Sequence, residues 1–184
     1  MQMTPSIRQT RLAIALSAMT TLCLFADATQ ANDAEIARGK YLVTLAGCGD
    51  CHTPGHFFGK PDPTRVLGGS DVGFQIPGVG TIVGSNLTPD EATGIGSWTR
   101  EQIARAIRSG VRPDGRVLAP VMPWAAFSKL SADDTNAIVS YLKQLPPVKH
   151  RVPGPLPADQ PPSTFSWKLT PPGNPGGGKT STIR

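Results

Sequence analysis

The hydrophobic positions of the chain form three helical stretches, which are separated by long segments rich in glycine and proline. Residues 33–46 carry a partly helical apolar stripe, and Asn32 or Asp33 is placed to cap its first turn. Residues 100–109 repeat such a stripe. In residues 132–145, apolar side chains recur at i, i+3, i+4 and i+7. The pattern therefore predicts three helices.

The ends of the second and third helices are marked by capping and breaking residues. Thr99 and Gln102 have the spacing of a capping box at the start of the second helix, and Gly110 is placed to end it. Ser131 precedes the third helix, which two prolines beginning at Pro146 stop. These signals fix both helices to within a turn.

The segments between and after the helices predict little regular structure. The chain contains 20 glycines and 19 prolines, and they gather in residues 60–96 and again after Pro146. We expect residues 151–184 to be an extended or disordered tail. Within the first helix, Gly39 either permits a second helix to approach closely or is simply tolerated there. The fold class predicted for residues 32–150 is therefore all-α.

The first 31 residues predict a cleaved export signal. Two arginines precede an uncharged apolar run over residues 12–26, and small residues allow cleavage after Ala28 or Ala31. The alternative is a retained membrane anchor, but the run is shorter than the roughly 20 apolar residues that a span requires. We expect the mature chain to begin near residue 32.

The charge of the chain favours acidic protein partners over nucleic acid. The formal net charge is +5, and removal of residues 1–31 leaves it positive. No run of lysine and arginine with interleaved aromatic residues accompanies this charge. The positive excess therefore suggests docking onto acidic partners.

The chemistry of the sequence is concentrated in the string Cys48-Gly49-Asp50-Cys51-His52. This is the C-x-x-C-H pattern of covalent haem attachment. Two thiols three positions apart can each form a thioether with one haem vinyl group. The histidine that follows is then held beneath the iron. The string predicts one covalently bound haem c.

Three other uses of these residues compete with haem attachment. A structural zinc site would need about four ligands, and no second cysteine pair is present. A thiol-redox pair would be expected near a βαβ pattern, which the sequence lacks. A disulfide between Cys48 and Cys51 would leave His52 without a role. Haem attachment explains all three residues together.

The second axial ligand of the iron is predicted by elimination. Of the 4 methionines, only Met122 lies outside the expected signal, and it sits between Pro120 and Pro123 in a stiff loop. The histidines His56 and His150 are alternatives, but we expect them to be exposed or locally bonded. An open sixth position would instead make the protein a haem enzyme or a sensor of small ligands.

These residues together resemble the class I cytochrome c family, and more narrowly the cytochrome subunits of bacterial periplasmic or membrane-associated dehydrogenases. The resemblance runs from about residue 33 to residue 147 and rests on the haem string and on residues 86–90, 93–98, 120–123 and 141–147.

The resemblance implies a class I cytochrome c fold, thioether bonds at Cys48 and Cys51, and axial ligation by His52 and Met122. It also implies a periplasmic electron carrier, not an enzyme in its own right, that takes electrons from a dehydrogenase and passes them to a terminal acceptor. Many such subunits carry several haem modules, whereas this chain has one haem string. Whether the chain is a free carrier or part of a complex stays open at this point.

Overall fold

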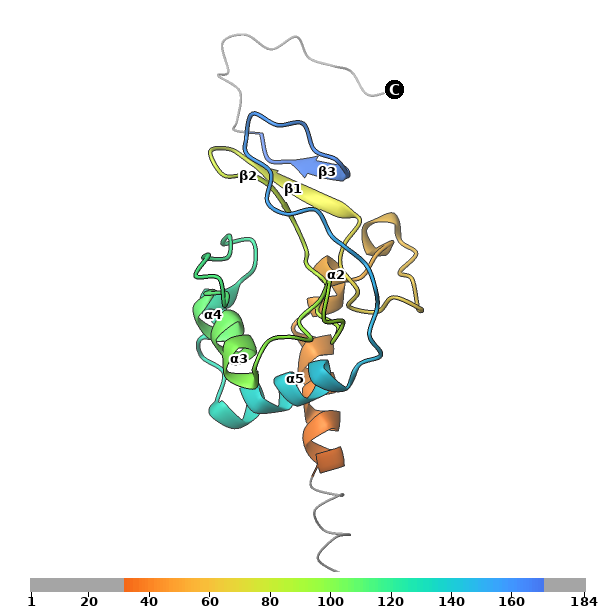
Figure 1. Cartoon of the computed structure of the whole chain (residues 1–184), viewed down its shortest axis with the longest axis vertical. Coiled ribbons are helices and arrows are strands. Elements are labelled where there is room, and N and C mark those ends of the chain that lie inside the picture. Colours follow the sequence, from red (N-terminus) through yellow and green to blue (C-terminus); the bar gives the residue numbers. More distant parts are fainter. Residues whose placement is uncertain (1–31, 171–184) are drawn as a thin grey trace, which may run out of the picture.

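The computed structural model describes residues 32–170, and the expected export signal in residues 1–31 lies outside that range. An N-terminal helix covers residues 32–45. The helices that follow are α2 (Cys48–His52), α3 (Arg100–Ser109), α4 (Trp124–Phe127) and α5 (Ala132–Gln144), with a short 3-10 turn η1 (His56–Phe58) after α2 (Figure 1). None of the helices in the described range is both long and apolar enough to cross a bilayer.

The three helices predicted from the sequence are all present, and the predicted caps of α3 and α5 form as expected. Thr99 accepts a hydrogen bond from the backbone of Gln102, and the Gln102 side chain returns the bond, so the capping box is complete. Gly110 ends α3 in the left-handed conformation, with φ 67. Ser131 caps α5 by accepting from the backbone N–H of Asp134.

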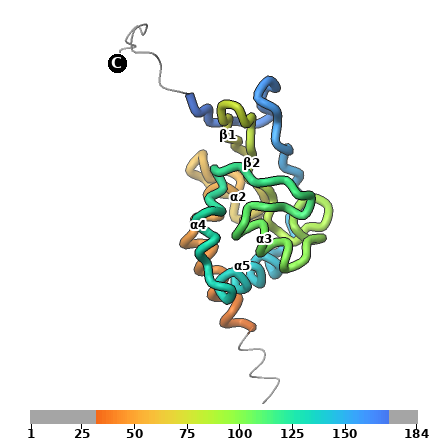
Figure 2. Tube along the Cα trace, turned by 90° about the vertical axis from the view of Figure 1, so that its left-hand side faces the viewer, coloured from red at the N-terminus to blue at the C-terminus, as the bar shows by residue number. Residues whose placement is uncertain are grey.

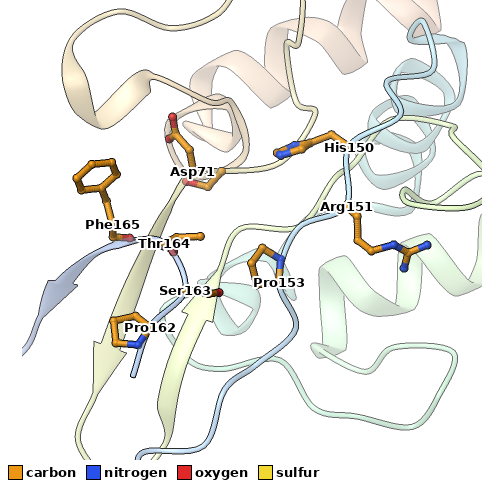
Figure 3. A pocket seen from close by; sticks show the side chains of 9 residues that line it. Asp71, His150, Arg151, Pro153, Pro162, Ser163, Thr164 and Phe165 are labelled. Carbon is orange, nitrogen blue, oxygen red and sulfur yellow. Dashed lines mark hydrogen bonds between the residues drawn. The ribbon is translucent and has the colours of Figure 1, made fainter. Parts of the chain in front are cut away.

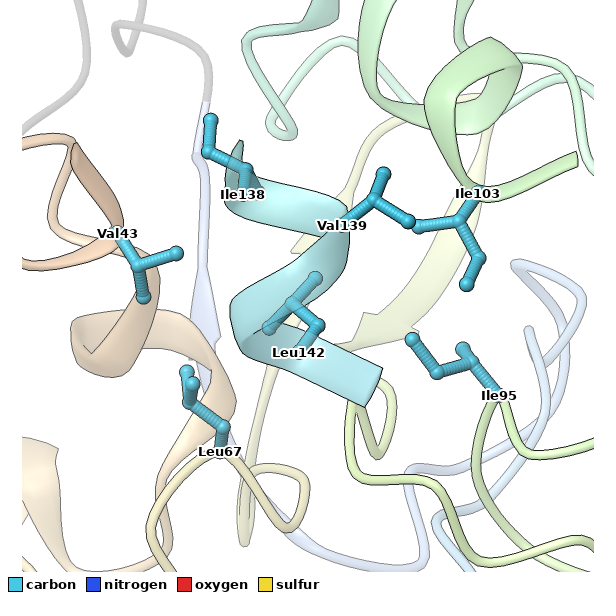
Figure 4. Close-up of a cluster of buried hydrophobic side chains, with 7 residues drawn as sticks. All are labelled: Val43, Leu67, Ile95, Ile103, Ile138, Val139 and Leu142. Carbon is cyan, nitrogen blue, oxygen red and sulfur yellow. The ribbon is translucent and has the colours of Figure 1, made fainter. Parts of the chain in front are cut away.

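The hydrophobic core is assembled around α5. Ile138, Val139 and Leu142 of this helix point into a cluster of buried aliphatic side chains from four other parts of the chain (Figure 4). The other members are Val43, Leu67, Ile95 and Ile103. The core therefore joins the N-terminal helix, the segment after the haem string and α3 through a single helix.

Gly39 allows the N-terminal helix to cross α5 at close range. A Cβ atom built at this position would lie 1.9 Å from the carbonyl oxygen of Ala137, which no real side chain tolerates. Of the two interpretations of this glycine, close helix approach is the one confirmed.

The prediction of an all-α fold is wrong, because the molecule also contains a three-stranded sheet. Its strands are β1 (Val72–Ile76), β2 (Gly80–Val83) and β3 (Phe165–Lys168), in the order β2-β1-β3. β1 and β2 form an antiparallel hairpin, while β3 pairs parallel to β1, with Val72 opposite Phe165. Figure 1 shows the sheet at the end of the molecule remote from α5.

The sheet escapes sequence analysis for a physical reason. β1 and β2 are short and contain glycines, which weaken a strand signal. β3 lies in the segment 151–184 that was expected to be a tail without regular structure, and only its pairing with a distant strand makes it a strand. Aromatic contacts support that pairing, since the ring of Trp167 lies 5.1 Å from Phe57 and 6.3 Å from Phe74.

Candidate functional site

The residues of the haem string lie together on the short helix α2. A left-handed Gly47, with φ 64, turns the chain out of the N-terminal helix and into α2. One turn of α2 then carries Cys48, Cys51 and His52. Both thiols are free, so the structure contains no disulfide between them. The three side chains that haem attachment requires are thus presented by one rigid element.

His52 is buried and oriented by a backbone carbonyl. Its Nδ1 atom lies 2.7 Å from the carbonyl oxygen of Ser85. A carbonyl can only accept, so Nδ1 carries the proton and donates it. The other ring nitrogen, Nε2, is thereby left with its lone pair. Metal-binding histidines are commonly oriented through such a bond from the nitrogen that does not bind the metal.

The carbonyl of Ser85 is itself held in place by its neighbours. The carbonyl of Gly84 accepts from the backbone of Ser70 at 2.8 Å, and the N–H of Leu87 donates to Leu67 at 2.9 Å. Gly84 also passes very close to α2. A Cβ atom at this position would lie 1.7 Å from the carbonyl oxygen of Cys51. Glycine is therefore required for Ser85 to reach His52.

Asn86 fixes the same segment from the other side through its buried amide. Its Nδ2 atom donates to the carbonyl oxygen of Val148 at 2.7 Å. Its Oδ1 atom accepts from both the backbone N–H and the hydroxyl of Thr88, at 2.9 Å and 2.7 Å. Since Asn86 directly follows Ser85, this network anchors the residue that orients His52.

Burial favours the neutral forms of the two thiols and the imidazole of the string. Desolvation lowers the pKa of His52, and the hydrogen bond to Ser85 opposes this only in part. Burial raises the pKa of Cys48 to about 11, and burial followed by the charge of Asp50 raises the pKa of Cys51. At neutral pH, His52 is therefore the neutral imidazole that coordinates metals.

The donor set fits a covalently attached haem. Two free thiols lie three positions apart, and a neutral imidazole follows with one nitrogen already committed to a protein carbonyl. The described residues contain no group of three or more His, Cys, Asp or Glu side chains that could hold a metal ion by themselves.

Met122 lies in the tight turn that precedes α4. Its N–H donates to the carbonyl of Ala119 at 2.9 Å, and its own carbonyl accepts from Trp124 at 2.8 Å. The indole of Trp124 donates to Leu118 at 3.2 Å. Throughout residues 32–170, no hydrogen bond joins Met122 to residues 48–52. The turn is firmly built, but ligation by Met122 remains a prediction.

The two other histidines have local partners, as expected. His150 donates through Nδ1 to the carbonyl of Gly68 at 2.7 Å. His56 lies 3.6 Å from the carboxylate of Asp50.

A concave region lies where the C-terminal segment passes β1, and none of Cys48, Cys51, His52 and Met122 lines it. Asp71, His150 and Phe165 are among the residues that line it (Figure 3). One oxygen of Asp71 accepts from the backbone of Gly55 at 3.0 Å. The region is a gap between the sheet and the chain that crosses it.

The residues that sequence analysis missed are those that orient the imidazole. Gly84 and Ser85 contribute through a close approach and a backbone carbonyl, neither of which has a residue-specific signal. Asn86 belongs to one of the strings that carry the family resemblance, but its role as a hydrogen-bonding hub is visible only in the structure.

Comparison with known proteins shows the family to which the chain belongs, the cytochrome c family. The chain is 38% identical over 131 residues to the cytochrome c subunit of a quinone alcohol dehydrogenase of Gluconobacter oxydans. The aligned residues are 71% of this chain and 26% of the relative. It is 34% identical over 175 residues to the fructose dehydrogenase cytochrome subunit of Gluconobacter japonicus, covering 85% of this chain and 34% of the relative.

A diheme cytochrome c of Cereibacter sphaeroides is 38% identical over 120 residues, which cover 62% of this chain and 37% of the relative. No protein-family model matches the chain. The chain spans only about a quarter to a third of the length of the dehydrogenase subunits named above.

These similarities confirm the resemblance to the cytochrome c family. Taken with the haem string on α2, they support an electron-transfer cytochrome and imply haem c as its cofactor. The number of haems, their ligands and the partners of this chain are not given by the relatives, one of which is named as a diheme protein.

Proposed function

We propose that this chain is an exported, periplasmic cytochrome c that carries one haem, bound covalently through Cys48 and Cys51 and ligated by His52 and Met122. In this proposal, it accepts single electrons from a dehydrogenase and passes them to a downstream acceptor. It turns over no substrate by itself.

The observation that carries the proposal is the buried His52 with its Nδ1 atom bonded to Ser85 at 2.7 Å. When bound, haem supplies one-electron chemistry at its iron. The residues of the chain do the rest. Cys48 and Cys51 would tether the cofactor, and the Ser85 carbonyl holds the imidazole in the orientation and tautomer that leave Nε2 as the ligand. Such partners also raise the basicity of the ligating nitrogen.

A methionine as second axial ligand supports a carrier instead of an enzyme. His/Met ligation saturates the iron and raises its reduction potential. Met122 lies in a turn that its own backbone and the indole of Trp124 make rigid. A rigid turn would keep its ligand in place in both oxidation states.

The partner is inferred from the relatives, which are named as subunits of alcohol and fructose dehydrogenases. A dehydrogenase that oxidises an alcohol or a sugar needs an acceptor for its electrons, and a cytochrome of this type can provide it. The positive net charge of the chain favours an acidic docking face on that partner.

The proposal is tested on the purified exported protein. Its oxidised and reduced absorption spectra should be those of a c-type cytochrome, and its haem should stay with the protein in acidified organic solvent. The double variant Cys48→Ser/Cys51→Ser should lose haem in the same extraction. Asp50→Asn alters the same helix without touching a thiol, and should retain it.

Two outcomes would contradict the proposal. One is a wild-type protein that loses its haem as readily as the double variant, because attachment would then not be covalent. The other is rapid stoichiometric binding of carbon monoxide by the native ferrous protein, which would show an open sixth position and favour the haem enzyme or sensor.

A further inference from the structure

Four large apolar side chains at the sheet end of the molecule are exposed to solvent. Phe165 is 72% exposed, Trp167 57%, Phe58 56% and Leu169 53%. Phe165 and Trp167 lie in β3, Leu169 follows that strand directly, and Phe58 belongs to η1. These four residues are called the apolar patch below.

Strand geometry brings three of these side chains to one face of the sheet. Alternate residues of a strand project to the same side, so Phe165 and Trp167 share a face. The N–H of Leu169 donates to the carbonyl of Gln75 at 3.0 Å, which continues the pairing with β1 and keeps Leu169 in the same alternation. Phe74 of β1 stands opposite Trp167 and lies on this face as well.

The turn η1 packs against the same face and joins Phe58 to it. The ring centre of Phe57 lies 5.6 Å from that of Phe74 and 5.1 Å from that of Trp167. The ring of Phe58 lies 5.3 Å from that of Phe165, in an edge-on contact. Single exposed apolar residues are common on soluble proteins, but a contiguous group held in mutual contact marks an interaction surface.

Positive charge flanks the apolar patch. Lys60 comes two positions after Phe58, and Lys168 directly follows Trp167. Both lysines are exposed. Neither forms a salt bridge within residues 32–170. The charge of both lysines is therefore available to an outside partner.

The carboxylates near these lysines in the chain or the sheet already have partners. Asp62 Oδ2 lies 2.7 Å from Nε of Arg65. Asp71 accepts a backbone hydrogen bond at 3.0 Å through one oxygen, and its other oxygen is buried. These carboxylates do not offset the two lysines, so the border of the patch is cationic.

This composition fits an anionic lipid surface better than another protein. Lysine is depleted from protein–protein interfaces. Peripheral membrane anchors instead combine Trp, Phe and Leu on the inserted side with Lys that contacts the headgroups. The formal net charge of +5 also opposes pairing of two copies of the chain and favours an anionic surface.

We propose that the apolar patch docks the protein on the surface of an anionic lipid bilayer. The patch enters the headgroup region, and Lys60 and Lys168 reach the lipid phosphates with their long side chains. Figures 1 and 2 show the sheet at the end of the molecule opposite α5, so this orientation keeps α5 away from the bilayer. The inference goes beyond the proposed function and does not depend on the ligands of a haem.

The test mixes the purified exported protein with vesicles of phosphatidylglycerol and phosphatidylethanolamine, and measures the fraction that sediments with them. The wild type should bind these vesicles, and should bind vesicles of phosphatidylcholine much less. Phe165→Ser and Trp167→Ser should each lower the partition coefficient by about tenfold, because each removes an inserted ring. The control is Leu45→Ser, which removes a 70% exposed side chain from the N-terminal helix and should not change binding.

Three further variants leave the strands untouched, so that a defect in the sheet is not mistaken for a loss of binding. Phe58→Ser changes only η1 and should also weaken binding. Lys60→Gln should weaken binding at low salt and have less effect at high salt, where the attraction is screened. Lys40→Gln removes the same charge from an exposed position of the N-terminal helix and should leave binding nearly unchanged.

Three outcomes would overturn the inference. The first is equal binding by the wild type, Phe58→Ser and Trp167→Ser, and the second is a wild type that binds neither kind of vesicle. The third is a wild type that ignores vesicles but forms a dimer that Trp167→Ser abolishes, which would assign the patch to a second copy of the chain. The proposed function is judged separately, by haem extraction, and its failure would leave vesicle binding unaffected.

Discussion

The Nδ1 atom of His52 lies 2.7 Å from the carbonyl oxygen of Ser85, although the two residues are 33 positions apart in the chain. The bond connects the haem string to the segment that follows β2. It is possible because Gly84 presses its backbone against α2. The orientation of the proposed ligand therefore depends on residues that are distant from it in the sequence.

Gly84→Ala should destabilise the protein. The added methyl group would overlap the carbonyl of Cys51, so residues 84 and 85 must move away from α2. Overpacking of this kind costs about 1–3 kcal/mol. The matched control is Gly154→Ala, because nothing lies within 4 Å of a Cβ atom there. The free energy of unfolding of each variant is measured by denaturant titration. Equal midpoints for the two variants would show that the contact is not tight.

Asn86→Ala should also lower the free energy of unfolding. It removes the donor to Val148 and the acceptor for Thr88, and it leaves those buried groups unsatisfied. Each such group costs about 1–3 kcal/mol. Asn86→Asp keeps the acceptor for Thr88 but sets a buried carboxylate oxygen against the carbonyl of Val148, so it should be destabilised as well. An Asn86→Ala variant as stable as the wild type would contradict the role assigned to this side chain.

Met122→Ala should remove the weak long-wavelength absorption band that reports a sulfur-to-iron bond. The ferrous variant should then bind carbon monoxide, because the sixth position is vacated. Val121→Ala changes an exposed neighbour in the same turn and should keep the band. Persistence of the band in Met122→Ala would exclude this methionine as the ligand.

Asp62 should contribute stability that depends on pH. Hydrogen bonds from Thr64 and then from Arg65 lower the pKa of its carboxyl to about 2. The folded pKa is below the unfolded value of 3.8, so this stability is complete above that value and is lost as pH falls towards 2. Asp62→Asn should therefore be less stable than wild type at pH 7.

The measurement is the free energy of unfolding of both proteins between pH 7 and pH 2. The difference between them should be constant down to about pH 4 and should shrink as the pH approaches 2. The control is Asp159→Asn, at an exposed aspartate. A difference that does not change with pH would contradict the assignment.

Local signals predicted the helices, and only long-range contacts could have predicted the sheet. The capping box at Thr99 and the cap at Ser131 lie within a few residues of the helices they start, and both are present. β3 depends on β1, and its own sequence is dominated by neighbours that break regular structure. The thiols and the imidazole of the site could likewise be predicted, because they lie within one string of five residues. The position of the Ser85 carbonyl could not be predicted in this way, because it depends on how backbone segments that are distant in the sequence meet.

The parallel pairing of β1 with β3 has a consequence for the order in which the chain folds. Gln75 and Ser166, which hydrogen-bond across this pair, are 91 positions apart, whereas β2 follows β1 after a tight turn. Closing a longer loop costs more chain entropy, by about 0.6 kcal/mol for each doubling of its length. The β1–β2 hairpin can therefore form early, and β3 docks last. In a chain that emerges N-terminus first, Cys48 and Cys51 are therefore present before β3 can dock, while the sheet is still two-stranded.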